Sequence, residues 1–454
     1  MFEETQKAVK MLPDNYIIKL LFNNLQLDVP EEVGLDKNYK FRYENKVLEI
    51  NDSFFSRIPA SDSYLKRENI PDEVIWIDDP QSEKEKIPGL YGENKMIFEE
   101  DYIYCGLDIF ASSFFMLTRW EELFLPRDRF GRCDESEMFV VKHRLYTRPI
   151  VNEYIRLFRY LLFRLGIPIK ESTYRFHPFI THDIDYLFRY ASVRNLCQNL
   201  AGDILHRKSL KIFFQTCKNY LRYRLGIIGD PFDTFDELMD LSEKFGFKDA
   251  FYFKPTVKGE YDSTYDIRDK KVKLIIDKII RRGHEVGIHP SKNTFHNLNQ
   301  FNREVTRLNK IYPGISGGRQ HFLLYDLPIT LHAWEDNGLL YDAGLGFAFR
   351  GGFRCGICYP YPFFNVLEKK ELKLKIRPLI VMEGALLQYD KEKSLDLIEQ
   401  EILDLIDIVY RYNGEFVFLW HNDHFYRYEY QNHAIIYKRI IEHIGLLTHG
   451  SMSR

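Results

Sequence analysis

From Phe179 onward, short apolar runs alternate with stretches in which apolar residues recur at helical spacing. The apolar runs are typical of buried strands, and they fall at residues 179–181, 250–253, 285–288 and 416–420. A chain that alternates buried strands with amphipathic helices is constrained to a mostly parallel sheet with helices packed on it. We therefore expect an α/β fold, built over residues 179–454 as an irregular (β/α) barrel.

The first 165 residues show shorter strands and two clear helical stretches, at 106–122 and 149–165. They predict a smaller α/β N-terminal domain. The polar, proline-flanked segment 166–178 is expected to be the linker between the two domains. Residues 119–122 (RWEE) are expected on a helix docked in the core, with a sugar-stacking surface as the alternative.

Composition narrows the functional classes. The formal net charge is −3, which argues against a protein that coats nucleic acid. The longest apolar stretches fall short of the roughly 18 residues of a membrane span, and Met1 is followed by acidic residues rather than a basic leader. Six cysteines without a second C-x-x-C pair predict reduced thiols, with a redox-active Cys355/Cys358 pair as the alternative. We expect a cytoplasmic protein.

One segment departs from the regular alternation of strands and helices. Residues 186–229 carry eight Lys or Arg and one acid, Asp203, and are expected to form helices inserted after the first barrel strand. The segment is interpreted either as a solvated helical face or as an anion-binding patch that makes peripheral contact with a membrane.

The end of the first barrel strand carries two carboxylates, Asp183 and Asp185, in the segment 181–185 (THDID). At i and i+2 on a strand they point to the same side and can share a cation. Like charges at this spacing also separate in pKa, so that one can act as a base while the other is a ligand. Two alternatives are an aspartate that caps the next helix and the nucleotide-sugar site of a glycosyltransferase.

Three later strand ends add further polar side chains. His289 directly follows a strand, and Asn293 lies four residues further on. Arg319 follows two glycines, which let the backbone approach closely and let the guanidinium clamp a carboxylate. His421 follows the last strand and is suited to donate a proton. Because functional groups collect at the carboxyl ends of parallel strands, these four clusters are expected to meet.

In this order and spacing the motifs resemble those of the polysaccharide deacetylases, the NodB-homology group of carbohydrate esterases, over roughly residues 175–430. The segments 181–185 (THDID), 283–293 (GHEVGIHPSKN), 317–322 (GGRQHF) and 419–423 (LWHND) carry the resemblance. It implies a distorted (β/α)7 barrel. The N-terminal residues resemble an accessory domain found with some bacterial deacetylases of this kind.

The resemblance also implies roles. Asp183 takes the place of the catalytic base, Arg319 that of the residue holding it, and His421 that of the general acid. Asp185 and His289 take the places of ligands to a divalent metal, zinc first, with cobalt, nickel or iron as alternatives.

Asn293 stands where the family has a second metal-binding histidine. Three outcomes stay open: Asn293 binds through oxygen, another histidine (His182, His296 or His424) replaces it, or the site does no chemistry. Asp342 is a candidate to orient the acid histidine.

The resulting hypothesis is a metal-dependent hydrolase that removes the N-acetyl group of a sugar in a surface polysaccharide or its precursor. The substrate is then a carbohydrate, with no nucleic-acid partner. A backbone N–H near His321 or Phe322 would hold the oxyanion. The alternative is a non-catalytic carbohydrate-binding protein on the same fold, which the substitution at Asn293 motivates.

Overall fold

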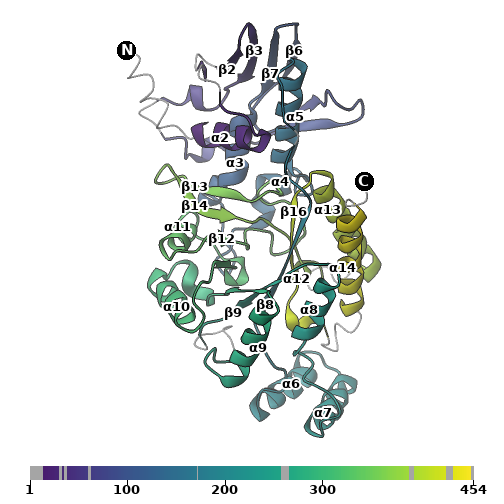
Figure 1. Cartoon of the computed structure of the whole chain (residues 1–454). Helices are drawn as coiled ribbons and strands as arrows, with labels where there is room; N and C mark the ends of the chain where they lie inside the picture. Colours follow the sequence, from purple (N-terminus) through teal and green to yellow (C-terminus); the bar gives the residue numbers. More distant parts are fainter. Residues whose placement is uncertain are drawn as a thin grey trace.

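The computed structural model describes residues 14–29, 33–34, 38–59, 63–170, 172–256, 265–387, 393–425 and 433–450. A smaller sheet occupies one end of the molecule, at the top of Figure 1, and a larger curled sheet with its helices forms the body. An antiparallel two-stranded ribbon accompanies the smaller sheet.

The smaller sheet has five strands in the order β1-β2-β3-β7-β6. Its elements and those around it are α2 (Asp14–Leu25), β1 (Val33–Gly34), β2 (Asn38–Tyr43), β3 (Lys46–Asn51), η1 (Phe55–Arg57), η2 (Arg67–Asn69), β4 (Ile75–Asp78), β5 (Lys86–Gly89), β6 (Gly92–Phe98), β7 (Tyr102–Leu107), α3 (Ile109–Thr118), η3 (Trp120–Leu123), η4 (Glu135–Glu137), α4 (Phe139–Lys142) and α5 (Ile150–Arg164). Every residue of α3 is buried, and so are the four residues Arg119–Glu122. This part of the chain is therefore core rather than a sugar-stacking surface.

The larger sheet has nine strands in the order β13-β14-β12-β11-β10-β9-β8-β16-β15. Its neighbours pair in parallel except β13, which runs antiparallel to β14. The strands are β8 (His177–Ile184), β9 (Ala250–Phe253), β10 (Glu285–Ile288), β11 (Gly317–Gly318), β12 (Tyr341–Asp342), β13 (Tyr361–Asn365), β14 (Lys370–Ile376), β15 (Leu379–Met382) and β16 (Glu415–Leu419). The expected mixed α/β fold is confirmed, and the barrel takes the form of a curled half-barrel whose edges are β13 and β15.

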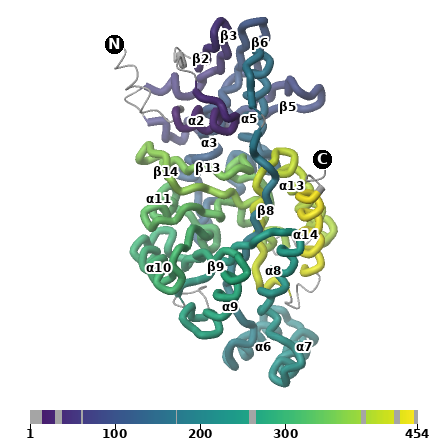
Figure 2. Tube along the Cα trace, in the orientation of Figure 1, coloured from purple at the N-terminus to yellow at the C-terminus, as the bar shows by residue number. Residues whose placement is uncertain are grey.

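Helices lie around the outside of this sheet, as the chain trace in Figure 2 shows. They bury apolar stripes against buried strands such as β9 and β16. The helices are α8 (Phe235–Glu243), α9 (Lys270–Arg281), η5 (Lys292–Phe295), α10 (Leu298–Ile311), η6 (His321–Leu323), α11 (Ile329–Asp336), α12 (Glu383–Leu387), α13 (Leu395–Arg411), η7 (Asn422–His424) and α14 (His433–Gly450). Among the described residues, no helix has both the length and the apolar character that crossing a bilayer requires.

The basic segment after β8 forms two helices, α6 (Val193–Leu205) and α7 (Leu210–Arg224). They lie side by side at the end of the molecule opposite the smaller sheet, at the bottom of Figures 1 and 2. The two ends of the molecule are thus chemically different: an aromatic-rich α/β unit at one and a basic helical pair at the other.

Candidate metal centre

The carboxyl ends of six strands of the larger sheet bring ionisable side chains to one place. Parallel strands end at the same edge of a sheet, so the residue that follows each strand faces the same space. The side chains come from β8 and the residue after it (Asp183, Asp185), and from the residues after β9 (Lys254), β10 (His289), β11 (Arg319, His321), β15 (Glu383) and β16 (His421).

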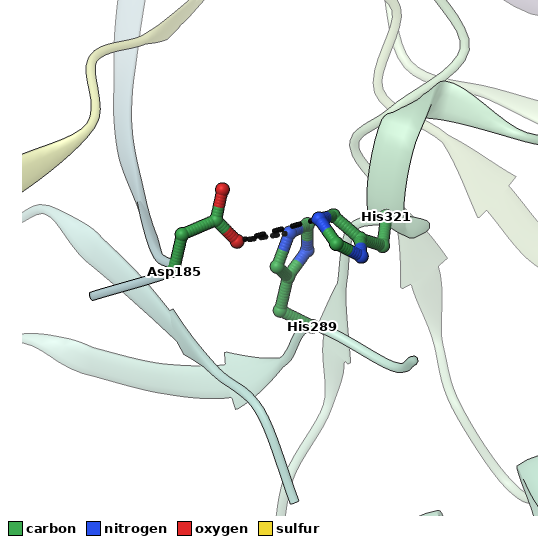
Figure 3. Close-up of side chains that lie close together, drawn as sticks. All are labelled: Asp185, His289 and His321. Atoms are coloured by element: carbon green, nitrogen blue, oxygen red, sulfur yellow. Dashed lines mark ion pairs between the residues drawn. The ribbon is translucent and has the colours of Figure 1, made fainter. Parts of the chain in front are cut away.

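Asp185, His289 and His321 form a compact group (Figure 3). Asp185 Oδ1 lies 3.4 Å from His289 Nε2 and 3.5 Å from His321 Nε2. One ligand atom from each residue lies within 4.8 Å of the others. One carboxylate and two imidazoles are a common donor set for zinc, cobalt, nickel and iron.

The tautomer of His289 suits this role. Its Nδ1 donates to the carbonyl of Arg319 at 2.8 Å, which leaves the lone pair on Nε2 facing the group. Nε2 is buried and has no hydrogen-bond partner in the described part of the chain. Burial, with the nearby Lys254 ammonium, lowers the pKa of His321 well below its usual value, so that this imidazole is neutral. The Nε2 atoms of His289 and His321 and the carboxylate of Asp185 therefore form a donor set that fits a divalent cation.

Lys254 is the unusual member of the centre. Its side chain is only 1% exposed, and its Nζ lies 2.8 Å from Asp185 Oδ1 and 3.0 Å from His321 Nε2. Burial alone would raise the pKa of Asp185, but the adjacent Lys254 ammonium holds this pKa well below its usual range. The Asp185 carboxylate thus already has Lys254 as a cationic neighbour. A metal ion bound to Asp185 Oδ1 would lie close to the Lys254 ammonium.

Asp183 is held by Arg319. The guanidinium donates from Nη1 to Asp183 Oδ1 at 2.8 Å, from Nη2 to the Thr181 hydroxyl at 2.8 Å and from Nε to the Ala343 carbonyl at 2.9 Å. Asp183 Oδ2 lies 3.7 Å from His289 Nε2. Three hydrogen bonds fix the Arg319 guanidinium. Of the two Asp183 oxygens, Oδ1 is bound to Arg319 and Oδ2 faces the metal ligand His289.

His421 sits on the other side of the group and is paired with Glu383. Glu383 Oε1 accepts from the His421 backbone N–H at 3.0 Å and lies 2.6 Å from Nδ1 of both His421 and His424. Burial would lower the pKa of His421, but Glu383 outweighs it and raises the pKa to about 10. His421 Nε2, 3.8 Å from Asp185 Oδ2, is therefore protonated at neutral pH.

These groups line one pocket of about 240 Å³. Its lining includes Asp183, Asp185, His289, His321, His421 and His424, and also Arg132 from the N-terminal part of the chain. The ionisable side chains and the pocket thus coincide.

Asn293 does not take the third ligand position. It lies in η5 with its side chain exposed, and His321 contributes the third ligand atom instead. His296 is exposed as well. His182, on the opposite side of β8 from Asp183, donates from Nδ1 to the Trp420 carbonyl at 2.7 Å and contacts Asp249 at 3.3 Å.

Asp342 is buried at the end of β12, away from His421. It accepts from the Tyr325 hydroxyl at 2.9 Å and from the Gly344 N–H at 3.0 Å, and burial raises its pKa to about 6. Glu383, and not Asp342, occupies the position beside His421. All six cysteines are free, and burial raises the pKa of Cys355 to about 11 and that of Cys358 higher still. This disfavours the thiolates that redox exchange needs.

Fold and site together define a mixed α/β protein with a mostly parallel curled sheet and a buried His/Asp group that could bind a metal ion. A family of unknown function, DUF7033, matches residues 6–166. No curated protein matches the chain. Among solved structures, the chain is similar to a "putative polysaccharide deacetylase from Mycobacterium smegmatis", with 13% identity, coverage of 61% of this chain and 86% of that chain, and a TM-score of 0.38.

Proposed function

We propose that the protein is a metal-dependent deacetylase that hydrolyses the N-acetyl amide of a sugar in a polysaccharide or its precursor. The observation that carries the proposal is the convergence of the Asp185–His289–His321 group with Asp183 and His421 on one pocket. The motif order along the chain, which resembles that of the polysaccharide deacetylases, supports it from the sequence side.

Asp185, His289 and His321 would hold the metal ion. When bound, such an ion polarises a carbonyl and makes water more acidic. Asp183, whose Oδ2 faces the metal ligands while Arg319 holds Oδ1, takes the proton of the attacking water.

His421 is the proton donor to the departing amine nitrogen. Its raised pKa keeps the imidazolium charged, and Glu383 fixes the ring so that Nε2 faces the pocket. A backbone N–H of His321 or Phe322, both in the pocket wall, is assigned to the developing oxyanion.

The test combines metal content with acetate release from N-acetylglucosamine oligomers. His289→Ala and His321→Ala are expected to lose both bound metal and activity. Asp183→Asn is expected to keep the metal and lose acetate release by about 10²-fold or more, because only the base is removed. Asn293→Ala, at an exposed side chain outside the group, is the matched control and should keep both. Full activity of Asp183→Asn would reject the assigned base.

A second candidate is a non-catalytic carbohydrate-binding protein on the same fold. Lys254 favours it, because a buried ammonium already neutralises Asp185 where a metal would bind. In that case the wild-type chain stays metal-free in excess zinc, binds the oligomers and releases no acetate.

A further inference from the structure

We propose that the α6–α7 hairpin (residues 193–227) is a docking surface for an anionic membrane. The proposal is independent of the deacetylase function, since it concerns a surface and not the pocket.

Eight large apolar residues of the hairpin are exposed, each with 45–68% of its surface accessible: Val193, Ile204, Leu205, Leu210, Phe214, Leu221, Leu225 and Ile227. Leu210, Phe214 and Leu221 of α7 and its C-cap residue Leu225 recur at helical spacing and form one stripe. Such clustered apolar exposure marks an interaction surface, whereas single exposed apolar residues are ordinary.

The same surface is positively charged. Residues 186–229 carry eight Lys or Arg and one acid, although the whole chain has a net charge of −3. That acid, Asp203, is buried and turned inward, where it accepts from the Thr216 hydroxyl at 2.6 Å and pairs with Arg207 at 2.9 Å. Five basic residues have no carboxylate of the described residues within 4.0 Å: Arg194, Lys208, Lys211, Lys218 and Arg222.

The α6–α7 hairpin is held together by helix caps and by side-chain hydrogen bonds. Ser192 and Ser209 cap the first turns of α6 and α7, and the Asp203–Thr216 bond ties one helix to the other. At its base, Asp230 accepts from the backbone N–H groups of Arg189 and Tyr190 at 2.9 Å each. The apolar and basic side chains are therefore presented on a fixed scaffold at the tip of the molecule (Figure 1).

Apolar side chains flanked by unpaired lysines and arginines fit the interface of an anionic bilayer. The apolar side chains enter the headgroup region, and the cations face the lipid phosphates. A neutral protein partner would leave the charges unpaired. The hairpin also begins in the loop that leaves Asp185, so the docked surface and the pocket share one loop.

The test is co-sedimentation of the full chain with vesicles at 0.15 M salt. Vesicles of phosphatidylcholine with 40% phosphatidylglycerol are compared with pure phosphatidylcholine. Wild type is expected to bind the anionic vesicles, more weakly as salt rises, and to leave the neutral vesicles largely unbound. Absence of binding to the anionic vesicles would overturn the proposal.

Two variants separate the contributions. K211Q/K218Q/R222Q is expected to weaken binding on the order of 100-fold, since each cation near an anionic surface contributes a few-fold. F214S/L221S is expected to weaken it at least about tenfold, through lost apolar burial. Both change exposed side chains, so the thermal unfolding midpoint should stay at the wild-type value.

Matched controls change equal numbers of exposed apolar and basic residues elsewhere on the surface: L367S/L397S and K270Q/K273Q/K373Q. They are expected to bind as wild type. Equal losses in the controls would overturn the proposal, because binding would then not depend on the hairpin. So would a Phe214-dependent dimer in sedimentation without vesicle binding, which would make a second copy of the chain the occupant.

Discussion

At the scale of single residues, the positive charge of Lys254 opposes the binding of a metal ion in the centre. Its ammonium is buried and lies beside both Asp185 and His321. Two cations a few ångströms apart repel by several kcal/mol at the effective dielectric of a protein interior. A metal ion can therefore bind well only if this ammonium moves aside or loses its proton.

We predict that Lys254→Met raises the affinity for zinc at least about tenfold, because it removes that repulsion and keeps the volume of the side chain. Chelator competition measures the effect directly. Lys270→Met, at an exposed position of α9, is the control and should leave the affinity at the wild-type value. An unchanged or weaker affinity in Lys254→Met would show that the lysine supports the metal ligands rather than competing with the metal.

The Glu383–His421 pair predicts a pH dependence. The pKa of His421 is raised to about 10, above its ordinary 6.5, so the pair stabilises the fold fully below about pH 6.5 and loses this contribution as pH rises through 10. If His421 is the proton donor of the proposed reaction, the alkaline limb of the activity is expected near pH 10.

In Glu383→Gln the charge that raises this pKa is gone, and the alkaline limb should move toward neutral pH. Profiles of kcat between pH 5 and 11 measure the shift. Asp407→Asn is the control: Asp407 pairs with His443 on the surface, 3.1 Å away, so its profile should match wild type. A Glu383→Gln limb that stays near pH 10 would exclude His421 as the titrating donor.

At the scale of elements, the strand ends were predicted from the sequence but the third ligand was not. Buried apolar runs locate β8, β9, β10 and β16, and the polar residues after three of them carry the motifs that resemble the deacetylases. His321 was expected only to offer a backbone N–H, because the resemblance places the remaining metal ligand at position 293. His321 lies two residues after Arg319, just as Asp185 lies two residues after Asp183. This spacing is visible in the sequence and could have indicated His321 as a ligand.

Lys254 and Glu383 also lie directly after buried strands, but they were not selected from the sequence. Each directly follows a buried run, 250–253 and 379–382, so position alone could have selected them. Their charge partners could not be predicted, since Lys254 with Asp185 and Glu383 with His421 are pairs distant in sequence. Such pairing depends on the curvature of the sheet, which a single sequence does not specify.

Gly318, in β11, allows this strand to approach β10 closely and so places His321 near His289. A Cβ added there would lie 1.9 Å from the Ile288 carbonyl oxygen, on the neighbouring strand. Gly318→Ala must therefore push β11 away from β10, which separates His321 from His289. We expect loss of metal binding together with lower stability, measured by metal titration and urea unfolding.

Gly229→Ala is the control for that substitution, because nothing lies within 4 Å of a Cβ at Gly229. It should keep both wild-type properties. A Gly318→Ala protein with normal metal affinity would mean that the separation of the two strands does not set the ligand geometry.

At the scale of the whole molecule, the N-terminal part is joined to the half-barrel by buried charges. Arg354 of the half-barrel pairs with Glu122 at 2.7 Å, and Glu122 also accepts from Arg119 at 3.1 Å. Glu135 accepts from the Ala348 backbone N–H, and the Tyr361 hydroxyl donates to the Leu117 carbonyl at 2.9 Å. With Arg132 in the pocket wall, the smaller unit contributes both to the stability of the half-barrel and to the site.

Glu122→Gln leaves Arg119 and Arg354 buried without their shared carboxylate. Removing one partner of a buried ion pair costs about 3–5 kcal/mol, and we expect a loss of that size in the free energy of unfolding. Urea unfolding followed by circular dichroism and by tryptophan fluorescence should show one coincident transition, because both sides of the interface lose the same contact. Asp78→Asn breaks an exposed pair with Lys86, whose side chains are 89% and 61% accessible, and should cost less than about 0.5 kcal/mol. Two separate transitions in Glu122→Gln, with only the first shifted, would contradict this prediction. They would mean that the N-terminal part unfolds independently of the half-barrel, although it contributes Arg132 to the pocket.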